Sequence, residues 1–429
     1  MIISSPLPSS TDAIVIGAGL SGLAAARQLV EQGIDAHVVD ASDAVGGRVR
    51  TDEVDGFRLD RGFQVLLTAY EELQAQVDLA RLDLATFKAG SMIWTGKRLE
   101  TLGDPYRNPS SVISTLGAQV GTMTDKMKVA SLRRRLLGRS PSECFDGPDR
   151  STLEELESLG FSRGFIDSFF RPFLGGVFLE RELATSARLF NYYFRCFAAG
   201  DAAVPSAGMQ RLPELLAEPL RGRVTLNAPV RAISTSGVTM DDGTHISADQ
   251  VIVAADGHGA SMLLDEPSPD FKATVTSYFA CGQPPTSAGM LILDGEGVGP
   301  VNHVAVMSSI SPGYAPEGMH LVSVSGVDDA ADDPVAFEVE APRQLRRWFG
   351  ESVDLWSHLR TYTIPHALPR HPAGAIPGRG TRRRPDGVVV AGDHTEFGSI
   401  QGALLSGRRA AQMVLDAIRP TSTPAMHMP

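Results

Sequence analysis

The chain has 429 residues, 43% of them hydrophobic and 21% charged, which is typical of a globular protein with room for two hydrophobic cores. Its net charge of −11 argues against a nucleic-acid partner or an anionic membrane surface, since both are polyanions. There is no signal-peptide pattern, no transmembrane segment of about eighteen apolar residues, and no pairing pattern among the three cysteines. We therefore expect a cytoplasmic protein without disulfides or a metal site.

The first predicted elements are a strand, a glycine-rich turn and a helix. The apolar, β-branched run 13–16 predicts a buried parallel strand, and it leads into Gly17-Ala-Gly19-Leu-Ser21-Gly22 and a helical pattern. In a dinucleotide site, Gly17 makes the tight turn, Gly19 lets the backbone approach a pyrophosphate, and Gly22 lets helix and strand pack closely. The pyrophosphate lies on the helix N-terminus, so Ser21 of the same turn is also counted as a binding residue.

A second predicted strand, 36–39, ends in an acid. Asp40 stands at the distance from the glycines where a carboxylate accepts hydrogen bonds from the adenosine ribose, which favours FAD or NAD over NADP. Gly46, Gly47 and Arg48 follow shortly after. Close backbone approach and a positive charge at this place suit the longer dinucleotide, FAD.

With these residues the chain resembles the flavin-containing amine oxidoreductase superfamily, which includes amine oxidases, protoporphyrinogen oxidases and phytoene-desaturase-like enzymes. The resemblance recurs near the end of the chain, where a short apolar strand leads into Gly392-Asp393-His394 and a second helix follows. The resemblance implies that Asp393 binds a ribityl hydroxyl of FAD and that the helix start at Ala403 meets the pyrimidine edge. Gly392, Ser399 and Ile400 are counted with them as cofactor-binding residues.

The expected fold is therefore α/β, with a Rossmann-like (GR2-type) FAD-binding domain and an inserted α+β substrate domain. Because the flavin motifs lie near both ends, the FAD-binding domain is expected to combine residues 1–85, 205–265 and 375–420. In its middle segment the resemblance places the backbone of Val230 at the adenine. The substrate-binding domain would comprise residues 86–204 and 266–374, and residues 421–429 would form a flexible tail.

Residues 86–204 are expected to be mostly helical, and two helices in this stretch are predicted to start at capping boxes, Thr122 with Asp125 and Ser151 with Glu154. An unusual concentration of Phe and Tyr occurs between residues 161 and 197. Most of these rings are expected to form a core, and a subset is expected to line a flat apolar pocket. Strands predicted within 290–324 would form the base of that pocket.

The resemblance also suggests where the chemistry takes place. Flavin N5 accepts a hydride, so the protein mainly has to orient and enclose the substrate. Residues 60–64 resemble the segment that passes beside the isoalloxazine, where Gly62 would permit close approach. Gln64, His394 and Glu396 are the candidate catalytic residues. The alternative, that His394 and Glu396 are ordinary surface side chains, stays open.

Two departures from the amine-oxidase branch bear on the substrate. That branch has a lysine that reaches flavin N5 through water, whereas the matching run 273–280 has none and Lys272 lies outside the apparent register. It also has an aromatic cage residue where this chain has Ser399, which weakens cation–π selection of an amine. We expect a small, apolar substrate that is dehydrogenated, desaturated or oxidised. An amine oxidase releasing hydrogen peroxide, a non-redox FAD-dependent isomerase and a non-catalytic binding protein remain alternatives. The electron acceptor, oxygen or another carrier, and the oligomeric state stay open.

Overall fold

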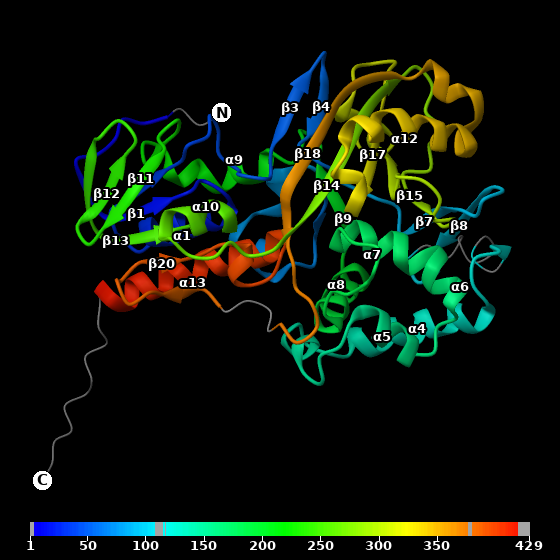
Figure 1. The fold of residues 1–429 in the computed structure, drawn as a ribbon, viewed down its shortest axis with the longest axis horizontal. Helices are drawn as coiled ribbons and strands as arrows, with labels where there is room; N and C mark the ends of the chain where they lie inside the picture. Colours follow the sequence, from blue (N-terminus) through cyan, green and yellow to red (C-terminus); the bar gives the residue numbers. More distant parts are fainter. Residues whose placement is uncertain (1–3, 108–114, 116, 376–379, 419–429) are drawn as a thin grey trace, which may run out of the picture. The chain divides into compact units, whose positions relative to one another are not determined.

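The computed structural model describes residues 4–107, 115, 117–375 and 380–418 (Figure 1). Contacts divide the chain into two compact units. The first unit combines Met1–Gly47, Pro213–Pro269 and Pro377–Pro429, and the second combines Arg48–Leu212 and Asp270–Ile376. The tail expected at residues 421–429 lies outside the described residues.

The first unit is built on a largely parallel sheet. Its described strands follow the order β10-β2-β1-β13-β12-β11, with β20 beside β13 and β19 beside β20. Strands β10, β2, β1, β13 and β20 are parallel, so their carboxyl ends share one edge. The bounds are β1 Ser10–Ile16, β2 Ala36–Val39, β10 Val224–Thr225, β11 Val230–Ser234, β12 Gly237–Met240, β13 His245–Val253, β19 Arg382–Arg383 and β20 Val389–Val390. The expected α/β class with a parallel sheet is confirmed.

Two long helices of this unit pack against each other, α1 (Leu20–Glu31) and α13 (Ile400–Ile418) (Figure 1). They approach very closely at Gly407, where an added Cβ would lie 2.2 Å from the carbonyl oxygen of Ser21. A residue without a side chain is therefore required at this crossing. The shorter helices are α9 (Arg211–Ala217), η5 (Glu218–Leu220) and α10 (Gly257–Leu264).

The second unit contains a mixed sheet of seven described strands, in the order β18-β14-β17-β16-β15-β7-β8. Neighbours are antiparallel except for β15 and β7. The apolar side chains of α12 (Pro334–Phe349) share a buried core with those of β14, β16 and β17. The bounds are β7 Gly90–Trp94, β8 Leu99–Gly103, β14 Phe271–Cys281, β15 Leu291–Asp294, β16 His303–Val306, β17 His320–Val327 and β18 Ser357–Pro369.

Most helices of the second unit lie between residues 123 and 199. Both predicted capping boxes are confirmed, since Thr122 caps α4 with Asp125 and Ser151 caps α5 with Glu154. Most of the predicted aromatic residues pack ring against ring here. The bounds are α4 Met123–Leu137, α5 Thr152–Ser158, α6 Arg163–Phe165, the π-helix η4 Ile166–Phe170, α7 Arg171–Phe178 and α8 Ala187–Ala199.

Two expectations differ from the structure. Residues 86–204 do not begin with helix, because β7 and β8 form a hairpin that joins the sheet through the parallel pairing of β7 with β15. Residues 48–85, expected with the FAD-binding domain, pack with the second unit. They start with the hairpin of β3 (Thr51–Val54) and β4 (Phe57–Asp60), whose last residue is hydrogen-bonded to Met209 and Tyr314 of that unit.

The smaller elements of the second unit complete its description. A three-stranded sheet has the order β5-β9-β6. The bounds are β5 Leu66–Leu67, β6 Leu84–Thr86, β9 Ala202–Pro205, α2 Glu71–Gln76, α11 Met307–Ile310, η1 Leu79–Leu82, η3 Ser142–Phe145, η6 Pro312–Tyr314, η7 Asp328–Ala331 and η8 Gly350–Leu355. Within the described ranges, no helix combines the length and hydropathy needed to span a bilayer.

Candidate functional site

The glycines after β1 are required by the geometry of the turn. Gly17 has a φ of +110°, and an added Cβ would lie 2.6 Å from the carbonyl oxygen of Ala254. A Cβ on Gly22 would lie 1.9 Å from the carbonyl oxygen of Gly17, so α1 can start this close to the strand only with glycine there. Gly19, by contrast, has open space where its Cβ would lie, and it precedes α1 as a cap residue without a side chain. The first turn of α1 is therefore approachable from the side of Gly19.

The segment after β2 closes around this turn. The amide of Gly46 donates to the carbonyl of Ala18 at 2.8 Å, and a Cβ on Gly47 would lie 3.3 Å from the Cα of Gly19. Asp40, at the end of β2, accepts a hydrogen bond from the amide of Ala18 at 2.5 Å. Both glycines have positive φ angles, +120° for Gly46 and +59° for Gly47. The structure thus brings Asp40, the glycines of the turn after β1, and Gly46 and Gly47 to one corner of the sheet.

These residues fit a dinucleotide phosphate. The first-turn amides of a helix lack intrahelical partners, and no acidic side chain occupies the first turn of α1. Among the described residues, the buried hydroxyl of Ser21 has no hydrogen-bond partner. Open space at Gly19, an uncapped helix N-terminus and an acid at the end of β2 are the features that FAD needs at its pyrophosphate and adenosine ribose. Val230, predicted at the adenine, starts β11 opposite Met240 and is half-buried.

The C-terminal motif lies at the same edge of the same sheet. β20 runs parallel to β13, and the amide of Ala391 donates to the carbonyl of Val253 at 2.8 Å. Gly392, with a φ of +144°, lies close to the backbone of Ala255, next to the residue that Gly17 contacts. Asp393 follows as a buried residue at the start of η9 (Asp393–Thr395). The two motifs, far apart in sequence, therefore converge in the first unit.

The start of α13 is fixed by its own cap. The hydroxyl of Ser399 accepts from the amide of Gly402 at 2.9 Å, and its carbonyl accepts from the amide of Ala403, also at 2.9 Å. Ile400 is the first helical residue and is half-buried. A Cβ on Gly402 would lie 1.9 Å from the carbonyl oxygen of Phe397. Ser399 thus takes the role of a helix N-cap, and the flavin contacts of Ser399, Ile400 and Ala403 stay predictions.

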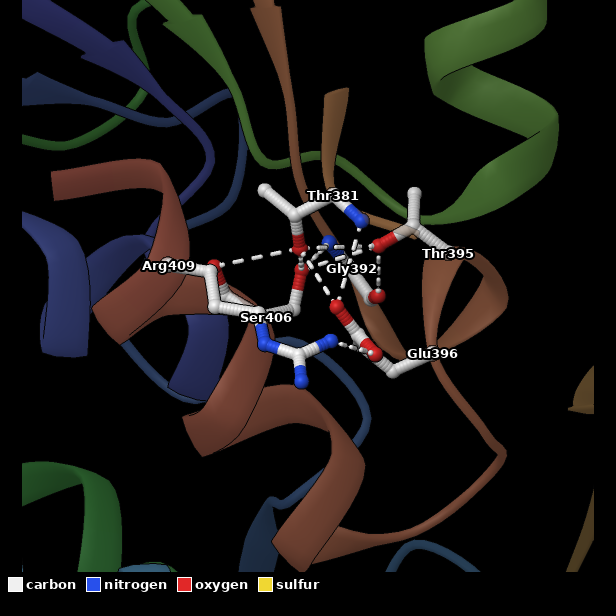
Figure 2. Close-up of polar contacts among 6 residues, drawn as sticks. All are labelled: Thr381, Gly392, Thr395, Glu396, Ser406 and Arg409. Carbon is white, nitrogen blue, oxygen red and sulfur yellow. Dashed lines mark hydrogen bonds and ion pairs between the residues drawn. The ribbon is translucent and has the colours of Figure 1, made fainter. Parts of the chain in front are cut away.

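Glu396 is at the centre of a buried polar network (Figure 2). One carboxylate oxygen accepts from the amide and the hydroxyl of Thr381 at 3.1 and 2.9 Å, and the other pairs with Arg409 at 2.6 Å. The imidazole of His394 lies against Gly392, only 2.4 Å from where a Cβ would be. Since both oxygens of Glu396 are engaged, the arrangement favours a structural role for this residue over the catalytic one.

Sequence reasoning missed the partners of Glu396, Thr381 and Arg409, and also Ser406, which is hydrogen-bonded to Thr381. Thr381 follows a Gly/Pro-rich stretch that carries no helical or strand pattern, and Ser406 and Arg409 read as ordinary helix residues. The only available signal was the spacing of Ser406 and Arg409, three residues apart, which puts them on one face of α13. A pattern of this kind does not identify the partner on another segment.

The remaining predicted site residues belong to the second unit. Gln64 donates from Nε2 to the carbonyls of Arg48 and Arg61, at 2.8 and 3.2 Å. The guanidinium of Arg48 donates to the carbonyl of Ala367 at 3.0 Å. Gly62 has a φ of +89°. Gln64 therefore fixes the backbone of its own segment, and the predicted flavin contacts of Arg48, Gly62 and Gln64 stay predictions.

Directly before this segment, Asp60 is a fully buried carboxylate without a basic partner in its hydrogen bonds. It accepts from the hydroxyls of Thr51 and Tyr314, at 2.5 and 2.8 Å, and from the amide of Met209 at 3.0 Å. Burial raises the pKa of Asp60 to about 6, although these three hydrogen bonds act to lower it. Its backbone carbonyl also accepts from the hydroxyl of Tyr278 at 2.9 Å. Asp60 thus joins four separate segments of the second unit.

Lys272 directly precedes the run 273–280, which by resemblance matches the strand that carries the flavin-linked lysine in amine oxidases. In the structure it lies within β14, its side chain is 3% exposed, and its ammonium pairs with Glu180 at 2.8 Å and donates to Thr185 at 2.8 Å. Burial acts to raise the pKa of Glu180, but the Lys272 ammonium and the hydrogen bonds from Thr185 together outweigh it and bring that pKa below its usual value. The ammonium of Lys272 is therefore engaged inside the second unit.

The aromatic residues divide into two groups. Phe165, Phe170 and Phe190 are fully buried and form a core, as expected for most of them. Phe169, Phe173 and Phe197 are only half-buried and form a continuous row, which we call the phenyl row. Phe169 and Phe173 stack with ring centroids 5.5 Å apart, and Phe173 and Phe197 meet at 5.2 Å. The phenyl row therefore keeps part of its apolar surface exposed.

Comparison with known proteins agrees with this geometry. The model of the family described as "Flavin containing amine oxidoreductase" matches residues 20–415. Hydroxysqualene dehydroxylase of Rhodopseudomonas palustris is 25% identical over 94% of this chain and 98% of its own. Human lysine-specific histone demethylase 2 is 30% identical over 56% of this chain, a match that spans only 29% of that protein. An oxidoreductase structure from Methanosarcina mazei has the same fold, with a TM-score of 0.72 and 19% identity over 93% of this chain and 99% of the other. This chain belongs to the flavin-containing amine oxidoreductase family, and it is an oxidoreductase with FAD as its cofactor.

Proposed function

We propose that the protein oxidises a small, apolar carbon substrate by removing a hydride and a proton from it, with FAD as the hydride acceptor. FAD supplies the redox chemistry at N5. In the first unit, Gly17, Gly19 and Gly22 would hold the pyrophosphate, Asp40 the adenosine ribose, and Asp393 the ribityl chain. The chain's own contribution is then to fix the cofactor and to bind an apolar molecule without water.

The observation that carries this proposal is the phenyl row. Three rings in contact that remain half-exposed offer rigid apolar surface, which favours a hydrocarbon or polycyclic ligand over a charged one. Hydroxysqualene dehydroxylase, similar over nearly the whole length of both chains, is named for an isoprenoid substrate. We therefore place the chain nearer the desaturase-like branch of the family than the amine-oxidase branch.

The pairing of Lys272 also supports the desaturase-like branch over the amine-oxidase branch. A lysine that serves a flavin must keep its ammonium available, whereas that of Lys272 is neutralised by Glu180 and hydrogen-bonded to Thr185. Ser399, at the position of the aromatic cage residue, caps α13 instead of offering a ring to an amine cation. We also propose the cytoplasm as the compartment, a proposal supported by three buried cysteines, none of them in a disulfide.

The decisive experiment is anaerobic reduction of the bound flavin. Purified protein is mixed with isoprenoid alcohols and polyenes of increasing length in one series, and with primary amines and polyamines in another, while the absorbance of oxidised flavin is followed. The proposal expects loss of the flavin absorbance with a member of the apolar series only. Reduction by an amine, with hydrogen peroxide released once oxygen is admitted, would establish amine oxidation instead.

A variant pair then tests the phenyl row. Phe173→Ala should lower kcat/KM for the apolar substrate at least about tenfold, because a large part of the apolar contact is lost. Phe349→Ala removes a half-buried ring from α12, away from the phenyl row, and serves as the matched control. Equal losses in both variants would show that the row has no special part in substrate binding.

A further inference from the structure

We propose that Glu396, Thr381, Ser406 and Arg409 form a positioning network for FAD: they hold the Gly392–Asp393 turn in the conformation that the cofactor requires. The inference rests on the proposed contact of Asp393 with FAD. It assigns to Glu396 a task that neither a surface residue nor a catalytic acid would have. Figure 2 shows the six residues involved, which are Thr381 directly before β19, three residues of the segment after β20 that contains η9, and two residues on one face of α13.

The hydroxyl groups of the network link the carboxylate of Glu396 to the backbone of Gly392. The hydroxyl proton of Thr381 goes to Glu396, and the hydroxyl proton of Thr395 goes to the carbonyl of Gly392. Ser406 accepts from the amide of Gly392 at 2.9 Å, so its own proton must go to the hydroxyl of Thr381 or of Thr395, at 2.8 or 2.9 Å. A chain of contacts therefore links the carboxylate of Glu396, through Thr381 and Ser406, to the amide of Gly392.

Both polar backbone groups of Gly392 are bound by this network. Its amide donates to Ser406, and its carbonyl accepts from the hydroxyl and the amide of Thr395, at 2.8 and 3.0 Å. The conformation of Gly392, with a φ of +144°, is one that other residues rarely adopt, and only external contacts keep a glycine in it. Asp393 comes next in the chain, so its direction follows from the conformation of Gly392.

Burial gives the network its strength. Ser406 is fully buried, and Thr381, Thr395 and Glu396 are each less than a tenth exposed. Removing one member leaves buried donors or acceptors without a partner, which costs more than the hydrogen bond itself contributes. Arg409 is about half-exposed, so it neutralises Glu396 from the side of the solvent.

The test measures FAD affinity and unfolding separately. Apo-protein is titrated with FAD, and its melting temperature is recorded without FAD. Ser406→Ala should weaken FAD binding about tenfold or more while the apo-protein stays folded at the titration temperature. Ser261→Ala is the matched control, because it removes another buried hydroxyl of the first unit, which donates only to the carbonyl of His258. FAD binding should be unchanged in that variant.

The charge of Glu396 is tested by a rescue. Glu396→Gln retains an acceptor for Thr381 but turns an amide donor toward Arg409, so FAD affinity should fall. The double variant Glu396→Gln/Arg409→Met removes that conflict, and we expect it to regain most of the lost affinity. A merely structural role predicts the opposite pattern, in which FAD affinity follows the apo melting temperature across all variants, and this result would overturn the proposal.

Asp393→Ala separates this inference from the site on which it rests. If Asp393→Ala binds FAD as tightly as the unmodified protein, the proposed contact of Asp393 is wrong. If Asp393→Ala weakens binding but Ser406→Ala does not, the site stands and the positioning network is refuted. The visible spectrum of bound FAD gives a second readout, since a displaced turn changes the environment of the flavin without changing overall folding.

Discussion

At the scale of single residues, Asp60 makes stability depend on pH. Its pKa rises from 3.8 to about 6 in the folded protein, so the folded state binds this proton more tightly than the unfolded chain does. Its contribution to stability is therefore complete below pH 3.8 and is lost as the pH rises through about 6.

We predict that the stability of Asp60→Asn, whose side chain is neutral at every pH, increases relative to that of the unmodified protein as the pH rises. A shift of two pKa units corresponds to roughly 3 kcal/mol, so the difference in unfolding free energy should change by up to that amount between about pH 4 and about pH 8. Paired thermal unfolding scans of both proteins across this range measure the effect. A difference that stays constant with pH would mean that Asp60 is not the titrating group.

The individual residues of the glycine turns could be predicted from the sequence, but the hydrogen-bond partners of the polar side chains could not. Gly17 and Gly22 are required by the covalent geometry of a short strand–turn–helix connection, which a local motif encodes. Glu396 has a local sequence typical of a loop acid near a flavin. Whether its carboxylate faces a ligand or a neighbouring segment depends on Thr381 and Arg409, which are brought to it only by the complete fold.

At the scale of elements, Lys272 and Glu180 connect the start of β14 to the residues that follow α7. We predict that Lys272→Met lowers the unfolding free energy by about 3 to 5 kcal/mol, because it leaves the Glu180 carboxylate buried without its partner. Thermal unfolding of the variant measures this loss. The double variant Lys272→Met/Glu180→Leu should recover most of the stability, and a double variant less stable than the single one would contradict the argument.

The elements with a strong period or a tight motif were predictable. Strand 36–39 has the predicted bounds, and both predicted capping boxes form, at the starts of α4 and α5. The hairpin of β7 and β8 was missed, since its pairing with β15 joins segments about two hundred residues apart and no local pattern encodes such a partner. The same limit explains why residues 48–85 were assigned to the other unit.

At the scale of the whole molecule, the first unit is assembled from three separate stretches of chain, and FAD is expected to contact all three of them. We predict that removing FAD lowers the melting temperature of the protein. By mass action, a ligand at one hundred times its Kd stabilises the folded state by about 2.7 kcal/mol. Differential scanning calorimetry with and without added FAD measures the shift.

Riboflavin is the control for this prediction, because it lacks the pyrophosphate and the adenosine that the glycine turn and Asp40 would bind. It should raise the melting temperature much less than FAD at the same concentration. An equal effect of both ligands would show that the N-terminal motif contributes little to binding, whatever the isoalloxazine contacts.

The strand order of the first sheet also determines when this protein can mature during its synthesis. β1 and β2 leave the ribosome first, yet β13, the neighbour of β1, is translated much later, and β20 later still. Until then β1 of the nascent polypeptide lacks its neighbour β13, and an unpaired apolar strand edge is prone to aggregation. We therefore expect cofactor loading to wait for the last part of translation, and a product truncated before β20 should not take up the vitamin-derived group.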